Sequence, residues 1–220
     1  MLPLRDVIPS RTFPFVTIAL IVLNALAWFY ELSLSADDLT VFLTTYGVVP
    51  AHFELPTLVT SMFLHGSWSH VFGNMLYLWI FGDNVEDRLG RPRFIAFYLL
   101  CGFVAAYGQM AMVPTSTLPT IGASGAIAGV MGAYLVLYPE SRVLTLVTLL
   151  FFWELVEVPA IFLLGFWFVM QLFSAGAIAA TSLNQGGVAF AAHVGGFVAG
   201  AIGVFVFRKP EAPDARWRPF

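Results

Sequence analysis

The stretch that decides the fold is residues 122–138, which read GASGAIAGVMGAYLVLY and contain no charged side chain. Within it, Ser124, Ala128 and Gly132 follow one another at intervals of four residues. Residues four apart share one face of a helix, and small side chains on that face let a neighbouring helix in lipid approach closely. The sequence therefore predicts a membrane helix that packs tightly against a partner.

The composition of the whole chain favours the same environment. Of its 220 residues, 59% are hydrophobic, 16% are aromatic and 10% are charged, and the mean hydropathy is +0.85. An average soluble domain carries about a quarter charged residues, so this chain has too little polar surface for a globule in water. No basic stripe indicates a nucleic-acid partner. The single cysteine, Cys101, excludes an internal disulfide.

Charge-free runs mark the candidate membrane helices, which are residues 13–30, 67–81, 94–113, 124–138, 158–174 and 188–207. A straight crossing of about 30 Å takes about twenty residues, so the second and fourth runs are short. The first run has basic residues before it but no small-residue cleavage site, so we expect it to be retained. We predict an all-α polytopic membrane protein with one transmembrane domain, residues 1–207, and a short cytoplasmic tail, residues 208–220.

The basic residues predict the orientation. All ten lie before the first run, between the second and third, after the fourth or after the sixth. The positive-inside rule then places both termini in the cytoplasm. Residues 34–65 lie outside and are too apolar for a free linker, so we expect them on the membrane or against the bundle. Residues 143–153 are apolar but too short to span, and we expect them at the membrane interface.

Polar side chains within the predicted spans are costly in lipid, so each needs a reason. His70, Asn74, Ser124 and His193 come from three different spans and lie within roughly two turns of their outer ends. An imidazole can accept the proton of a serine hydroxyl and pass it to a leaving amine. The start of the fourth span would direct backbone N–H groups toward an oxyanion, and Asn74 and His70 could donate to it as well. We predict a catalytic pair, Ser124 and His193, without a carboxylate to orient the histidine.

Small residues would bring these helices together. Gly125 and Gly129 form a second small pair on the fourth span, and Gly196 and Gly200 share a face with His193 on the sixth. The remaining polar residues in spans one and five, Asn24 and Gln171, we interpret as packing contacts.

Plainer interpretations compete with the catalytic one. A serine among small membrane residues usually packs helices, and His70 and Asn74 could be interhelical hydrogen bonders. A metal site of His65, His70 and His193 is disfavoured because the sequence has no HExxH motif and few carboxylates in the outer loops. We therefore expect no metal and no cofactor. An aspartyl protease would need two facing membrane carboxylates, and only Asp83 approaches a span.

The motifs resemble those of the rhomboid family of intramembrane serine proteases. They are Gly122-Ala123-Ser124-Gly125, the AHxxGxxxG pattern of His193, Gly196 and Gly200, the HxxxxHxxxN pattern of His65, His70 and Asn74, and the GxxxExxxG pattern of Gly82, Glu86 and Gly90. The resemblance covers roughly residues 11–207, with six helices in the expected order. Each motif is modest alone, but all of them in this order are highly specific.

The resemblance implies a six-transmembrane-helix rhomboid-like bundle with a membrane-associated first extracytoplasmic loop. It implies cleavage of peptide bonds in or next to transmembrane helices of single-span or polytopic membrane protein substrates. Ser124 would be the nucleophile, His193 the general base and acid, and Asn74, His70 and the Ser124 N–H the oxyanion hole. Span five and residues 181–187 would be the substrate gate and cap. We expect a prokaryotic cell membrane, with the site opening to the extracytoplasmic side, and no nucleic-acid partner; the oligomeric state stays open.

The sequence departs from the family pattern in three places. The family often carries an aromatic residue four positions after the nucleophile, stacked on the histidine, whereas this chain has Ala128, so something else must hold His193. Pro56 and Thr57 replace a frequent Trp-Arg pair in the first loop. Residues 143–157 are longer and more apolar than in compact bacterial members, without an assignable role. The alternative is a non-catalytic rhomboid-like protein that binds or escorts transmembrane helices, although such proteins typically lack the serine or the histidine.

Overall fold

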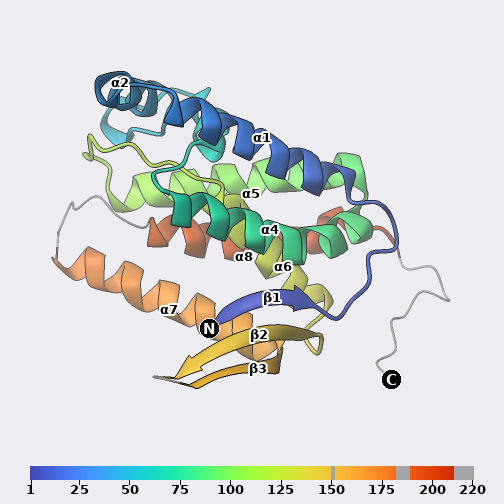
Figure 1. Ribbon diagram of the computed structural model, residues 1–220. Helices are drawn as coiled ribbons and strands as arrows, with labels where there is room; N and C mark the ends of the chain where they lie inside the picture. The colour runs from blue at the N-terminus through green and yellow to red at the C-terminus, as the bar shows by residue number, and fades with distance from the viewer. Residues whose placement is uncertain (150–151, 182–188, 211–220) are drawn as a thin grey trace.

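The computed structural model describes residues 1–149, 152–181 and 189–210 (Figure 1). The predicted cap, residues 181–187, and the predicted tail, residues 208–220, therefore lie mostly outside the described residues. In chain order, the elements are β1 (Leu2–Asp6), α1 (Phe15–Leu32), α2 (Ala36–Tyr46), the 3-10 turn η1 (Pro50–His52), α3 (Thr57–Thr60), the 3-10 turn η2 (Ser61–Phe63), α4 (Trp68–Leu89), α5 (Arg91–Met112), α6 (Ser124–Leu137), β2 (Arg142–Leu149), β3 (Phe152–Pro159), α7 (Ala160–Thr181) and α8 (Phe190–Phe207).

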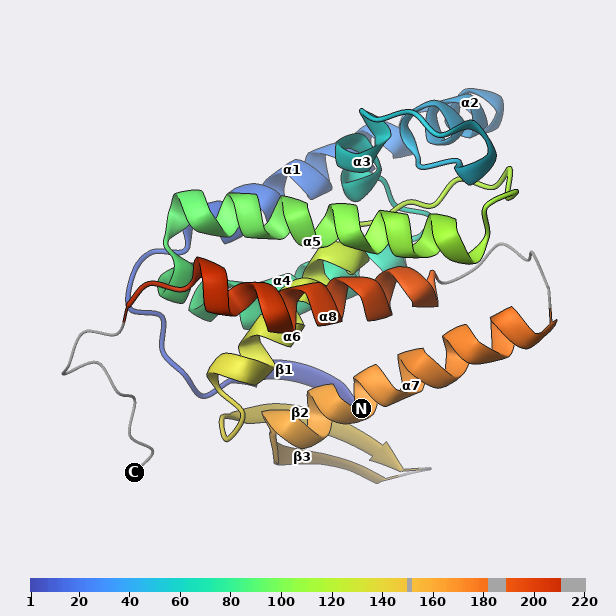
Figure 2. The same ribbon diagram turned by 180° about the vertical axis from the view of Figure 1, so that it is seen from behind.

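The fold is mostly helical, as the sequence predicts. Each of the six charge-free runs overlaps one helix, and the long helices α1, α4, α5 and α8 lie side by side with α6 among them (Figures 1 and 2). Within the described residues, four helices are long and apolar enough to cross a membrane, namely Phe15–Leu32, Arg91–Met112, Ala160–Ala177 and Phe190–Phe207. Helix α6 has only 14 residues, which gives it a length of roughly 21 Å at about 1.5 Å per residue.

Helix α4 continues well past the predicted end of its span at residue 81. It runs to Leu89 because its last turns contact the start of α1. The carboxylate of Glu86 accepts hydrogen bonds from the backbone N–H groups of Val16 (3.0 Å) and Thr17 (2.8 Å) and from the Thr17 hydroxyl (2.8 Å). The first N–H groups of a helix have no partner within it, so this buried side chain caps α1. Gly90, with φ of 81°, then lets the chain turn into α5.

The prediction of an entirely α-helical fold is wrong in one respect, because the chain also forms a three-stranded antiparallel sheet. Residues 143–153 are expected at the interface as a short apolar segment, but the described ones, 143–149 and 152–153, belong to strands β2 and β3. These two strands pair with each other, and β1 pairs with the other edge of β2. Leu146 lies opposite Leu2 on one side and Leu155 on the other. A pair of antiparallel strands is only marginally stable alone, so β1, at the N-terminus, stabilises the pair of β2 and β3 as the third strand of the sheet. Figure 2 shows the sheet beside α7, beyond the end of α6.

The long segment between α1 and α4 is ordered and folds back onto the bundle. Helix α2 begins at a serine cap, in which the Ser35 side chain accepts a hydrogen bond from the Asp38 N–H, and none of its residues is buried. Farther along, Val48 forms an isolated antiparallel bridge with Thr120, and the Gly122 N–H donates to the Ser61 carbonyl (2.8 Å). This segment therefore contacts the strand-like residues that lead into α6.

The helix-packing glycines on α6 and α8 face each other. A Cβ atom at Gly196 would collide with the carbonyl oxygen of Gly125, and one at Gly200 would collide with that of Gly129. Ten consecutive α6 residues, from Gly125 to Tyr134, are buried. The close approach allowed by small residues therefore places the start of α6 directly against α8.

Candidate active site

Ser124 and His193 meet where α6 and α8 pack together. Ser124 is the first residue of α6, and its Oγ lies 2.8 Å from Nε2 of His193, in the first turn of α8. The histidine is buried, with 8% of its surface exposed. Gly122, two residues before the serine, has φ of 116°, a conformation that L side chains rarely adopt. The tight turn at Gly122 therefore presents Ser124 at the helix start, where backbone N–H groups have no partner within the helix.

The other side of the His193 ring is held by α7. Nδ1 of His193 lies 2.8 Å from Oε1 of Gln171. The Trp167 ring lies alongside, with its centroid 5.7 Å from that of the imidazole, and Phe190 approaches edge-on at 6.4 Å. The interpretation of Gln171 as a packing contact is therefore wrong. One feature of the sequence could have indicated this contact. Gln171 is a lone amide in an apolar span, where a polar group needs a hydrogen-bond partner.

Asn74 and His70 flank the turn that precedes Ser124. A side chain at Gly122 would lie 2.6 Å from Nε2 of His70 and 3.7 Å from Nδ2 of Asn74, so the glycine leaves room for both. Among the described residues, neither His70 nor Asn74 forms a hydrogen bond with Ser124 or His193. The structure thus brings the two predicted oxyanion residues beside the start of α6, without a hydrogen bond to the serine–histidine pair among the described residues.

His65, in the loop before α4, holds the amide of Asn74. Its Nε2 lies 3.0 Å from Nδ2 of Asn74. An amide nitrogen can only donate, so the imidazole nitrogen accepts and the ring proton sits on Nδ1. Burial, together with the neighbouring His70, lowers the pKa of His65 to about 4, which keeps the ring neutral as this hydrogen bond requires. The sequence placed His65 in a motif but did not indicate its contact with Asn74.

The part of the chain that the structure describes contains no cluster of side chains that could bind a metal ion. Within residues 1–149, 152–181 and 189–210, no group of three or more His, Cys, Asp or Glu side chains could hold a metal ion. His65 and His70 lie close, with ring centroids 5.0 Å apart, but His65 already contacts Asn74. The histidines therefore fit the hydrogen-bonded arrangement described above.

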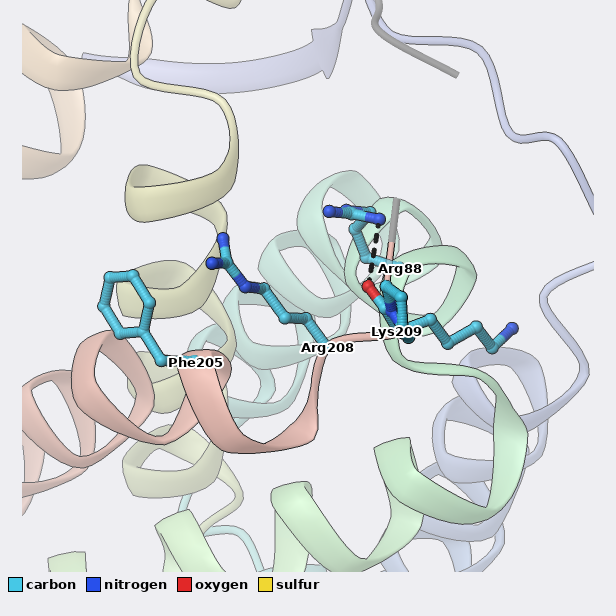
Figure 3. A pocket seen from close by; sticks show the side chains of 5 residues that line it. Arg88, Phe205, Arg208 and Lys209 are labelled. Carbon is cyan, nitrogen blue, oxygen red and sulfur yellow. Dashed lines mark hydrogen bonds between the residues drawn. The ribbon is translucent and has the colours of Figure 1, made fainter. Parts of the chain in front are cut away.

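A surface recess lies at the opposite end of α8 from His193. It is lined by Arg88, Phe205, Arg208, Lys209 and Pro210 (Figure 3). Two hydrogen bonds join its two sides. The Lys209 N–H donates to the Arg88 carbonyl (3.0 Å), and Nη1 of the Arg88 side chain donates to the Lys209 carbonyl (3.5 Å). The recess contains no residue of the serine–histidine pair, but it shows that basic side chains gather at this end of the bundle.

Comparison with known proteins gives one consistent answer. Residues 52–210 match the Rhomboid domain. Rhomboid protein 1, mitochondrial, of Saccharomyces cerevisiae is 29% identical over 73% of this chain and 44% of its own length. Two Bacillus subtilis proteins also match, the putative rhomboid protease YdcA (32% identical, 57% of this chain, 63% of its own length) and the rhomboid protease GluP (30% identical, 82% and 31%). The chain thus spans less than two thirds of the length of each of these relatives.

Proposed function

The chain belongs to the rhomboid family, and on this premise we propose that it is an intramembrane serine endopeptidase. Its substrates would be single-span or polytopic membrane proteins, cleaved in or next to a transmembrane helix. The single observation that carries the proposal is the 2.8 Å contact between Oγ of Ser124 and Nε2 of His193. Two relatives that are named as proteases support it.

The proposed reaction begins at this contact. His193 takes the Ser124 proton through Nε2 while Oγ attacks the scissile carbonyl carbon. The tetrahedral intermediate collapses to an acyl-enzyme as the imidazolium protonates the leaving amine. A water molecule, activated by the same imidazole, then releases the carboxylate product and restores the serine.

Stabilisation of the oxyanion falls to donors around Gly122. The Ser124 N–H lies at the start of α6, where the helix dipole favours negative charge. The side chains of Asn74 and His70 flank the same turn and would supply further hydrogen bonds. In this proposal His65 is a positioning residue, because its contact with the Asn74 amide leaves the second amide N–H of Asn74 for the substrate.

The proposed membrane arrangement has six spans, one transmembrane domain over residues 1–207 and a tail over residues 208–220, with both termini in the cytoplasm. Arg88, Arg208 and Lys209 gather at the end of the bundle away from Ser124, as the positive-inside rule favours for a cytoplasmic face (Figure 3). The short α6 would then start below the outer membrane surface. We propose a prokaryotic cell membrane, and the bacterial origin of the two B. subtilis relatives supports this choice.

One alternative has some support from the names of the relatives, since Rhomboid protein 1 and the presenilin-associated rhomboid-like proteins are not named as proteases. A non-catalytic protein would bind transmembrane helices without cutting them. The close contact of Ser124 with His193 favours catalysis, because helix binding alone does not require a serine–imidazole hydrogen bond.

The test is cleavage of a single-span reporter in liposomes. We expect the wild-type protein to cut the reporter and to react with a fluorophosphonate, and the Ser124→Ala variant to do neither. Ser69→Ala, a change of the same kind at an exposed serine near the start of α4, should leave both activities intact. Cleavage at the same bond by Ser124→Ala would overturn the proposal. Reporter binding without turnover by the wild type in any lipid would favour the alternative.

A further inference from the structure

Three side chains from three different helices form one chain of contacts in the bundle. Gln171 of α7 contacts Nδ1 of His193 on α8, and Nε2 of the same ring contacts Ser124 on α6, each at 2.8 Å. A histidine that uses both ring nitrogens in this way has its orientation fixed from both sides. The family pattern stated above leaves His193 without a stacked aromatic residue at Ala128, so its support must come from elsewhere.

We propose that Gln171 is the positioning residue of His193, an inference that rests on the proposed protease function. A carbonyl oxygen can only accept a hydrogen bond, so Oε1 of Gln171 requires a proton on Nδ1 of the ring. A neutral imidazole carries one ring proton, which leaves the Nε2 lone pair free to accept from the Ser124 hydroxyl. The opposite tautomer would direct an N–H at the serine and could not act as its base.

Helix α7 also fixes the plane of the ring. Trp167 precedes Gln171 by four residues, so both side chains lie on the same face of α7. The Trp167 ring lies beside His193 at an interplanar angle of 36°, and Phe168 stacks on Phe197 of α8 with centroids 4.5 Å apart. These contacts seat α7 against α8 at the level of the histidine. Helix α7 therefore supplies both the hydrogen-bond acceptor and the aromatic neighbour that α6 lacks at Ala128.

An amide suits this position better than the carboxylate found in other serine proteases. Gln171 lies within Ala160–Ala177, the part of α7 that is apolar enough to cross a membrane, where an ionised carboxylate would be costly. A neutral amide still fixes the tautomer, but it stabilises the imidazolium less than a charged partner would. Removing it should cost a catalytic factor of about 10 to 100, the equivalent of one hydrogen bond to a charged group.

The first experiment compares Gln171→Met, which keeps the size of the side chain but removes the acceptor, with Gln171→Glu, which keeps an acceptor oxygen. We expect Gln171→Met to lower kcat about 10- to 100-fold with KM changed less than about twofold. Gln171→Glu should retain most of kcat at alkaline pH. Its acidic limb should move to higher pH, because a carboxylate stabilises the protonated imidazolium, which cannot act as the base.

The control is Met170→Leu, at the neighbouring and more exposed position of α7, which should leave the kinetics unchanged. A second readout needs no proteolysis. In protein labelled with 15N-histidine, the wild-type His193 signals should report a proton on Nδ1, and Gln171→Met should give a mixture of tautomers. An unchanged kcat and unchanged tautomer in Gln171→Met would overturn the proposal, as would a Gln171→Glu variant whose pH profile matches the wild type.

The two proposals fail in different ways. If the protein is not a protease, the wild type neither cleaves the reporter nor reacts with the fluorophosphonate. If only the role of Gln171 is wrong, the wild type and Gln171→Met cleave equally well, and Ser124→Ala remains inactive.

Discussion

The carbonyl oxygen of Gly129 on α6 occupies the place where a Cβ atom of residue 200 on α8 would have to lie. The same relationship holds one turn earlier, between Gly125 and Gly196. The two backbones are therefore in direct contact, with no side chain between them. Because Ser124 and His193 sit at the end of this contact, the separation of α6 and α8 sets the distance between the hydroxyl and the imidazole.

The first prediction concerns Gly200→Ala. The added methyl group would meet the backbone of α6, which cannot turn aside as a flexible side chain can. We expect a loss of roughly 1–3 kcal/mol or more in the free energy of unfolding in mixed detergent micelles. Because the helices must separate, fluorophosphonate labelling of Ser124 should also slow down.

The matched control is Gly165→Ala on α7, where a Cβ atom would meet nothing within 4 Å. Alanine favours a helix over glycine by about 0.8–1 kcal/mol, so this variant should be as stable as the wild type or more so. Equal stability of Gly200→Ala and Gly165→Ala would show that α6 and α8 are not in backbone contact.

The second prediction concerns Glu86→Gln. The Glu86 side chain is 2% exposed, and its two oxygens accept three hydrogen bonds from the start of α1. An amide replaces one oxygen with a donor, which would face N–H or O–H groups that also donate. We expect a loss of about 1–3 kcal/mol in the free energy of unfolding. Glu140→Gln removes the same charge at an exposed site and should change the stability little; an equal loss in both variants would refute the capping role.

The helices could be predicted from the sequence because each is a local pattern. A charge-free run of sufficient length identifies a membrane helix wherever its neighbours lie. The end of α4 could not be predicted in this way, because it depends on a contact with another helix. Its last turns contain Asp83, Glu86 and Asp87, which break the pattern, and only the contact with α1 explains why Glu86 is buried in a helix.

The sheet could not be predicted because its pairing is not local. Residues 2–6 join residues 142–149, from the other half of the chain, and neither segment alternates strongly between apolar and polar residues. Gln171 was misjudged for a related reason. Helix α7 is apolar on all sides, so its sequence does not indicate which face packs against α8. The partner of Gln171 can be identified only when that face is known.

The third prediction concerns the pH dependence of the link between β1 and the bundle. One oxygen of the Asp6 carboxyl group accepts hydrogen bonds from the Tyr134 hydroxyl (2.6 Å) and the Asn84 amide (2.9 Å), with Asp83 nearby. Burial, and to a smaller extent the charge of Asp83, raises the pKa of Asp6 from 3.8 to about 7. The folded state thus holds a proton that the unfolded chain releases. Its stability should fall as the pH rises through this range.

The measurement is the thermal midpoint of the wild type and of Asp6→Asn in detergent from about pH 5 to about pH 8. Asparagine keeps an acceptor oxygen for Tyr134 and Asn84 but does not titrate. We expect the midpoint of the wild type to decline relative to that of Asp6→Asn as the pH rises. A wild-type midpoint that stays constant or rises relative to that of Asp6→Asn would mean that Asp6 is ionised in the folded protein throughout this range.

The last prediction concerns the proposed oxyanion donors. Asn74→Ala removes an amide that flanks the Gly122 turn and that His65 holds in place. If the amide stabilises charge only in the transition state, kcat should fall about 10²- to 10³-fold with little change in KM. His65→Leu should lower kcat less, because the amide remains but is free to rotate. Both effects should appear in reporter cleavage at unchanged thermal midpoints. A loss confined to KM would instead assign Asn74 to substrate binding, and a larger loss in His65→Leu than in Asn74→Ala would give His65 a direct role.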